Sequence, residues 1–319
     1  MAFSVSSLST YTAPARELLA KAVAAPSTVP FINVYTGIKG SEYVNTNYST
    51  MVFGSQNCGT SYDSTTTVTQ ALLSVEQFSY DEKLCPADFN TKSMNNKLKA
   101  GSANDDITFI NMFMDEKAQT IAFEMEKVIW GGNKTTGSGN MAKMNGFLQI
   151  LLHTSASANT VSGTTSVSTA ADAVTLVNKV VRRIPAAVIN RPDLVVFLPT
   201  DIYRLYVEGL NLATAANLQS TNTTAQNMVM KHPYYSNVTI VGTIGLDSGS
   251  VLSGDYCDAV ATYGENFLFG TDIESEGSNS RSADMFDIWF SKDLQSVVTA
   301  ARWKAGVQVA FPEFVVIER

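Results

Sequence analysis

The sequence predicts an α+β protein, and three observations support this class. Residues 105–130 repeat apolar side chains at intervals of three and four, which is the spacing of one face of a long helix. Residues 38–89 and 285–319 are rich in Thr, Val, Tyr and Phe or alternate apolar and polar positions, as β-strands do. Residues 140–280 mix helical and strand patterns, which indicates a compact α/β unit.

The composition describes a folded protein with few charges. Of its 319 residues, 45% are hydrophobic and 16% are charged, and the net charge is −7. Ser, Thr, Asn and Gly fill the polar positions, and surfaces with few charges suit wide contacts between proteins. No cluster of basic residues is longer than Arg182-Arg183. We therefore expect no tight or sequence-specific binding to nucleic acid.

Cysteine and histidine are few and scattered. Cys58, Cys85 and Cys257 are an odd number with wide spacing, which fits neither a disulfide framework nor a metal motif and indicates a reducing compartment. His153 and His232 stand in separate contexts, so a zinc site is not expected. We also find no signal peptide and no apolar run long enough to span a membrane, and expect no membrane partner.

The segment before the long helix is predicted to hold an arm and a hairpin. Residues 1–34 combine a polar lead with a short amphipathic helix whose apolar face is too small to fold alone. Residues 35–98 contain two strand patterns, at 48–53 and 65–78, with turn-forming residues between them. A two-stranded hairpin is marginally stable in water, so we expect a neighbouring molecule to stabilise it. The tip residues expected to form this contact are Gly54, Asn57, Gly59, Tyr62 and Asp63.

The long helix is the element around which the other parts are expected to pack. Asn104 is a plausible cap, and Gly131-Gly132 ends the pattern. We expect Phe109, Phe113 and Phe123 to widen its buried face. A helix of this length needs a sheet to lie on. The residues predicted to form its apolar core stripe are Ile107, Ile110, Met114, Ile121, Met125 and Val128.

The rest of the chain is divided between two predicted units. Residues 140–281 form the central α/β unit, with helices at 170–184 and 201–208, the second closed by Gly209, and a polar loop at 211–226. Its strands are predicted at 193–198, 238–241, 259–263 and 266–269. Residues 99–139 and 282–319 form the other unit, in which strands at 297–303, 307–309 and 315–317 pack on the long helix.

Three local motifs follow one another in a specific order. Ile129-Trp130-Gly131-Gly132-Asn133 ends the helix and is followed by Met144-Asn145-Gly146-Phe147-Leu148. The second motif is ENFLFGTD at 265–272, and the third is AARWKAGVQV at 300–309 followed by FVVI at 314–317. With the order of arm, hairpin, long helix, central unit and closing strands, they resemble the major capsid proteins of tailed bacteriophages over nearly the whole chain.

The resemblance implies a mechanical role without catalysis. The fold would have an N-terminal arm, an extended β-hairpin loop, a peripheral domain built on the long spine helix, and an axial α/β domain. Copies would assemble as pentamers and hexamers, in the host cytoplasm, into an icosahedral or prolate head around double-stranded DNA that they touch non-specifically. Portal and scaffolding proteins would be further partners, and decoration proteins could bind the head.

Two alternatives stay open. An encapsulin-type nanocompartment has the same fold but encloses cargo enzymes, and an α/β enzyme could occupy residues 140–280. The acidic pairs at 81–82 and 115–116 are interpreted as solvated faces, and 272–276 as an exposed acidic loop rather than a cation site. No catalytic, cofactor-binding or metal-binding residue is predicted.

Overall fold

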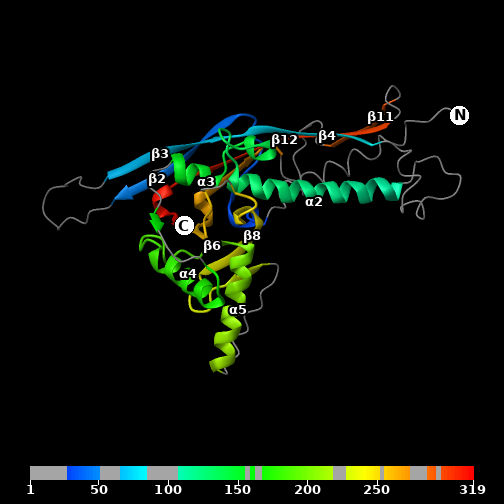
Figure 1. Cartoon of the computed structure of the whole chain (residues 1–319). Helices are drawn as coiled ribbons and strands as arrows, with labels where there is room; N and C mark the ends of the chain where they lie inside the picture. Colours follow the sequence, from blue (N-terminus) through cyan, green and yellow to red (C-terminus); the bar gives the residue numbers. More distant parts are fainter. Residues whose placement is uncertain are drawn as a thin grey trace.

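The computed structural model of the chain describes residues 27–50, 65–84, 107–154, 159–161, 167–217, 228–251, 255–273, 286–291 and 296–319. A long sheet runs beside helix α2 (Ile107–Gly131), and a second sheet carries helices α4 (Ala170–Arg183) and α5 (Thr200–Asn217) away from it (Figure 1). Within the described ranges, none of the helices has the length and apolar content needed to cross a membrane.

The sheet beside α2, here called the peripheral sheet, is organised around β12 (Ser296–Val309), a strand of 14 residues. Ala301 and Ala305 of β12 each pair with one strand on either side. Two of its neighbouring strands therefore lie one after the other along one edge of β12, and a third lies along the other edge. Those neighbours are β10 (Phe267–Thr271) and β11 (Phe286–Ser291) on one edge and β4 (Glu76–Leu84) on the other, while β1 (Asn33–Tyr35) pairs with β10.

Helix α2 packs on this sheet through the stripe that the sequence indicates. Ile121, Met125 and Val128 are 8%, 2% and 1% exposed and belong to the same core as Ala301 and Trp303 of β12. The side chains of residues 107–115 lie outside those that the structure describes, so the placement of Ile107, Ile110 and Met114 stays a prediction.

The expectation for Phe123 is wrong. This side chain is 43% exposed, and the Lys127 ammonium lies 4.1 Å from the centre of its ring. The reason is angular, since Phe123 follows Ile121 by two residues and therefore points about 200° around the helix from the buried stripe.

The end of α2 joins the two sheets. Trp130 is fully buried, and its ring lies 5.0 Å from that of Phe197 and 5.9 Å from that of Phe267, measured between centroids. Phe197 and Phe267 belong to different sheets, so one indole packs against both. The glycines that follow let the chain pass close to the segment before α3 (Phe147–Gln149), because a Cβ at Gly132 would lie 2.5 Å from the Met144 carbonyl oxygen.

The second sheet, here called the axial sheet, is buried on both faces. All residues of β6 (Leu194–Pro199) are buried, and they alternate between two cores. Val195 and Phe197 face the α2 core, whereas Leu194, Val196 and Leu198 face α4 and α5, which explains the continuous apolar run. The strand order is β5 (Asn159–Val161), β13 (Val316–Glu318), β9 (Ala259–Tyr263), β6, β8 (Val238–Thr243) and β7 (Val229–Lys231).

Helix α5 differs from the prediction. It continues through Gly209 to Asn217, so the first part of the predicted loop 211–226 is helical. Gly209 serves close packing instead of ending the helix, since a Cβ there would lie 2.5 Å from the Ala170 carbonyl oxygen of α4. The predicted helix at 170–184 is present as α4, with a capping box formed by Thr169 and Asp172.

Two strands lie in a different sheet from the one predicted for them. β13 pairs with β5 and β9 in the axial sheet instead of lying on α2. β10, expected in the central unit, pairs with β1 and β12 in the peripheral sheet. Strand spacing in the sequence carries no information on such distant partners, which is why the contiguous division 140–281 and 282–319 fails here.

The predicted hairpin is present as a separate two-stranded sheet. β2 (Ser41–Thr50) and β3 (Thr65–Ser74) have ten residues each and pair antiparallel along their whole length. The hairpin extends beyond the rest of the molecule, on the side away from the N-terminal end of α2 (Figure 1). The arm residues 1–26 and the predicted tip residues Gly54, Asn57, Gly59, Tyr62 and Asp63 lie outside the described part of the chain.

Candidate assembly surfaces

The hairpin has one exposed apolar face. Residues directly opposite one another in an antiparallel pair point to the same face. Tyr43 is opposite Leu72, and Val68 is two residues along β3 from Gln70, so Tyr43, Val68 and Leu72 share a face. They are 63%, 60% and 39% exposed. We call these three residues the hairpin face.

The opposite side of the hairpin is fixed to the peripheral sheet at its root. Leu73 is fully buried with Ile38 and Leu268, and Val44 and Ala71 pack against them. The same two strands therefore present one face that is packed at the root and another on which Tyr43 and Val68 are exposed.

A pair of glycines lets the hairpin cross the sheet closely. Gly270 of β10 is directly opposite Gly306 of β12. A Cβ on Gly306 would lie 2.0 Å from the Ser74 carbonyl oxygen, and one on Gly270 would lie 3.0 Å from the Leu73 side chain. A side chain at Gly306 would collide with the hairpin backbone, and one at Gly270 would crowd the Leu73 side chain, so the glycines permit β3 to pass into β4 at this point.

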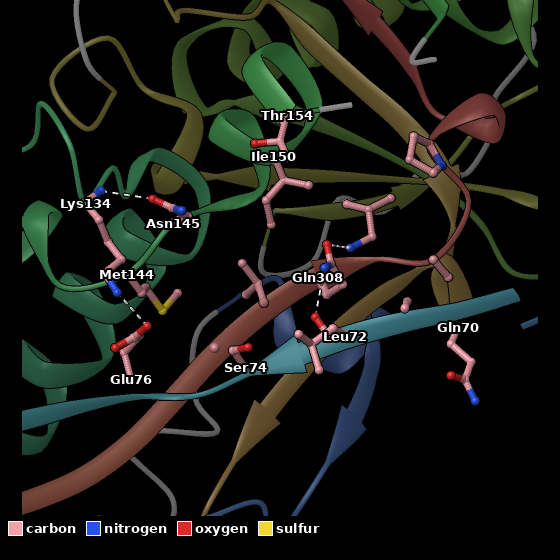
Figure 2. Close-up of a pocket in the computed structure, with 16 residues that line it drawn as sticks. Gln70, Leu72, Ser74, Glu76, Lys134, Met144, Asn145, Ile150, Thr154 and Gln308 are labelled. Carbon is pink, nitrogen blue, oxygen red and sulfur yellow. Dashed lines mark hydrogen bonds and ion pairs between the residues drawn. The ribbon is translucent and has the colours of Figure 1, made fainter. Parts of the chain in front are cut away.

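A groove of about 560 Å³ lies beside the hairpin root. Figure 2 shows Gln70, Leu72, Ser74 and Glu76 along one wall, the segment from Lys134 to Thr154 on another, and Gln308 between them. The Gln308 amide donates to the Leu72 carbonyl oxygen at 2.9 Å. Lys134 and Glu76 form an ion pair at 2.7 Å whose partial exposure makes it worth at most about 1 kcal/mol.

Beyond this groove, no strand in the described part of the chain pairs with the outer edge of β3. The Leu72 carbonyl points away from β2, toward Gln308. Backbone groups alternate in direction along a strand, so those of Gln70 and Val68, two and four residues before Leu72, also point away from β2. Across the twenty residues of β2 and β3, Glu42 is the one charged residue, and no proline is present. Exposed sheet edges usually carry charges or prolines that prevent pairing. An edge without such protection is a candidate surface for contact with another molecule.

One buried polar cluster has no signal in the sequence. Glu126 of α2 is 2% exposed and accepts hydrogen bonds from the Thr28 backbone N–H at 3.2 Å and the Ser27 hydroxyl at 3.1 Å. The hydroxyls of Thr28 and Thr243 donate to it as well, and the Trp130 indole donates to Thr28 at 2.7 Å. Glu126 thus ties the segment before β1, helix α2 and the end of β8 together.

Groups that could carry chemistry are dispersed. Among the described residues, no group of three or more His, Cys, Asp or Glu side chains is arranged to hold a metal ion. His153 pairs with Asp255 at 2.7 Å, while His232 lies elsewhere in the turn after β7. Burial raises the pKa of the Cys257 thiol to about 12, so this cysteine stays protonated and unreactive at neutral pH.

No protein-family profile and no curated protein sequence matches the chain. Solved structures do match. A chain of the satellite phage P4 procapsid with its size-determination protein has a TM-score of 0.56 and 12% identity, covering 95% of this chain and 89% of that one. The virus-like particle of Pyrococcus furiosus has a TM-score of 0.54 and 8% identity, with 97% and 99% covered.

A chain of Mycobacterium phage Ogopogo is similar to the same extent, with a TM-score of 0.53, 13% identity, and 92% and 91% of the two chains covered. These similarities extend over nearly the full length of each chain. The predicted α+β fold, that of phage capsid proteins, is therefore confirmed.

Proposed function

We propose that this protein is the major capsid protein of a tailed phage, whose copies assemble as pentamers and hexamers into a closed icosahedral or prolate head. The observation that carries this proposal is the full-length likeness to chains of phage particles. A second observation agrees with it, because the hairpin presents an exposed apolar face and a strand edge that no strand among the described residues pairs with.

The hairpin face supplies the adhesion that such a shell needs. Because Tyr43, Val68 and Leu72 are 63%, 60% and 39% exposed, burying them against a second copy would contribute about 1–2 kcal/mol for each of the first two and about 1 kcal/mol for Leu72. A single contact of this size is weak after the entropy of association is subtracted. A closed shell repeats it on every subunit, so the sum holds the particle together while single contacts can still open and correct errors.

The charge of the chain suits a container for DNA. With a net charge of −7, the protein would touch double-stranded DNA non-specifically and release it readily. Portal and scaffolding proteins are the further partners that we propose, with decoration proteins as additional ligands of the finished head. The protein would be assembled in the host cytoplasm and reside in the virion.

Electron microscopy of the purified full-length protein tests the proposal. We expect closed particles of uniform diameter, and in infected cells heads that contain DNA and carry a portal and tail. A protein that stays monomeric at micromolar concentration and shows enzymatic turnover would overturn the proposal in favour of an α/β enzyme.

A nanocompartment shell is the second candidate function, and one comparison favours it. The virus-like particle of Pyrococcus furiosus matches 97% of this chain over 99% of its own length. The two functions differ in content. Particles with DNA and a portal support the capsid, whereas small closed shells that hold cargo protein and no genome support the nanocompartment.

A further inference from the structure

The turn between β7 and β8 exposes two adjacent tyrosines. Tyr234 is 83% exposed and Tyr235 is 46% exposed. Seven large apolar side chains are exposed among the described residues. Five of them lie elsewhere: Val34 on β1, Tyr43, Val68 and Leu72 on the hairpin, and Phe123 on α2, beside the Lys127 ammonium. Tyr234 and Tyr235 are the remaining two, and they belong to the axial sheet.

The turn that carries these tyrosines is held by a buried histidine. His232 is 3% exposed, and its Nδ1 accepts hydrogen bonds from the backbone N–H groups of Tyr234 and Tyr235 at 3.2 and 3.3 Å. The rings of His232 and Tyr235 lie 5.1 Å apart between centroids. An Nδ1 that accepts must be unprotonated, so the neutral imidazole is the form that supports the turn.

Further bonds fix the base of the same turn. The Val238 N–H donates to the Tyr235 carbonyl oxygen at 3.0 Å, and the His232 N–H donates to that of Val238 at 2.9 Å. The Asn237 amide donates to the carbonyl oxygens of Ile189 and Arg191 at 2.7 and 3.1 Å. A turn held this firmly loses little conformational entropy when its aromatic side chains are buried by a partner.

The chemistry of the turn favours a second copy of this chain as that partner. Residues 233–238 carry no charged side chain, whereas the chain has a net charge of −7. Copies that share this charge repel one another except where uncharged surfaces meet. A closed shell also needs contacts on more than one side of each subunit, and the hairpin face supplies one side.

The tyrosines lie beside β7, an edge strand of the axial sheet, and the properties of this edge determine how a partner can bind there. β7 is the last strand of the axial sheet and has three residues, and Pro233 comes two residues after its end. Short edge strands and prolines disfavour the addition of another strand. A partner must therefore bind the tyrosine side chains, in contrast to the open strand edge of the hairpin.

We propose that Tyr234 and Tyr235, held by His232, form a second contact surface between copies of this chain, on the axial sheet. This inference rests on the proposed shell function. The contact buries both rings and leaves their hydroxyls to bond at its rim, which is the usual role of tyrosine at interfaces.

The test compares assembly of the full-length wild-type protein with that of the double variant Y234S/Y235S, followed by light scattering and electron microscopy over a range of concentrations. We expect the variant to fold normally, because both side chains are exposed, and to need at least about tenfold more protein before shells form. The matched control is F123S, which removes another exposed aromatic ring and should leave the assembly threshold unchanged.

A second pair of variants tests the role of the histidine. H232N keeps an acceptor in a position similar to that of Nδ1, and H232A removes it. We expect H232N to assemble near the wild-type threshold and H232A to require more protein. Shells from Y234S/Y235S at the wild-type threshold would overturn this inference and leave the shell function standing. A wild-type protein that forms no shells would refute both.

Discussion

The axial sheet and the hairpin both carry apolar side chains on their strands, yet they differ in how those side chains are covered. Every residue of β6 is buried, because α4 and α5 cover one face and the end of α2 covers the other. In the hairpin, Leu73 at the root is the one side chain among the described residues that is fully buried. On the other face, Tyr43 and Val68 are more than half exposed. The comparison teaches that one region is covered within its own chain, while the other exposes the surface that we propose a second copy covers.

The largest effect is expected where the covered region is broken. Ile121→Asp places a charge without a partner between α2 and the peripheral sheet, and should prevent folding to soluble protein. Phe123→Asp is the matched control on the opposite side of the helix, where the new carboxylate would lie beside Lys127. Soluble yield after expression measures both. Equal yields would contradict the assignment of the buried face.

Leu72 and Leu73 are neighbours on β3 but point to opposite faces of the hairpin, one exposed and one packed, so substituting each in turn compares the two faces. Leu73→Ala should lower the free energy of unfolding by about 2–5 kcal/mol, because Leu73 is fully buried. Leu72→Ala should lower it by less than about 1 kcal/mol but reduce the yield of closed shells. Urea unfolding and electron microscopy measure the two effects. Equal losses of stability would show that the hairpin face is packed within its own subunit.

The buried carboxylate tests how firmly the complete region is joined to the segment before β1. Glu126→Gln replaces an acceptor-only group by one that cannot accept from all of its donors, and should cost about 1–3 kcal/mol of unfolding free energy. Glu124→Gln, on the exposed side of the same helix, should cost less than about 1 kcal/mol, since it loses a partly exposed ion pair with Lys127. Comparable urea midpoints for the two variants would refute the role of Glu126.

The smallest effect is a pH dependence from His232. Burial lowers the pKa of His232 in the folded protein below its usual value of about 6.5. The unfolded chain therefore binds a proton more readily, so the stabilisation is complete above that usual value and declines as the pH falls through the lowered one. The difference in unfolding free energy between wild type and H232N should shrink over this range. A difference that stays constant with pH would contradict the assigned protonation state.

Local signals in the sequence predict much of the fold. The apolar run of β6, the Pro185 that follows α4, and the glycines after Trp130 all act on residues close to them in the chain. Gly209 misleads because its role is set by Ala170 of a different helix. The partners of β10 and β13 are likewise distant in sequence, so the exchange of strands between the sheets has no local signature.

The candidate site is predicted less completely for the same reason. The hairpin follows from its strand patterns, but which side chains are exposed depends on the register and on the packing at Gly270 and Gly306. Glu126 has the sequence context of a solvated residue, and its donors come from positions 98, 99 and 117 residues away. The roles of the tip residues between 54 and 63 stay predictions.

The position of β12 and β13 has a consequence for folding. Residues 296–309 form the centre of one sheet, and residues 316–318 are inserted between β5 and β9 of the other. Neither sheet can close without these residues, because they pair with strands that lie far away in the sequence. A polypeptide that lacks residues 296–318 would thus leave β9, β10 and β4 without their central partners, so these strands commit the fold of both sheets together.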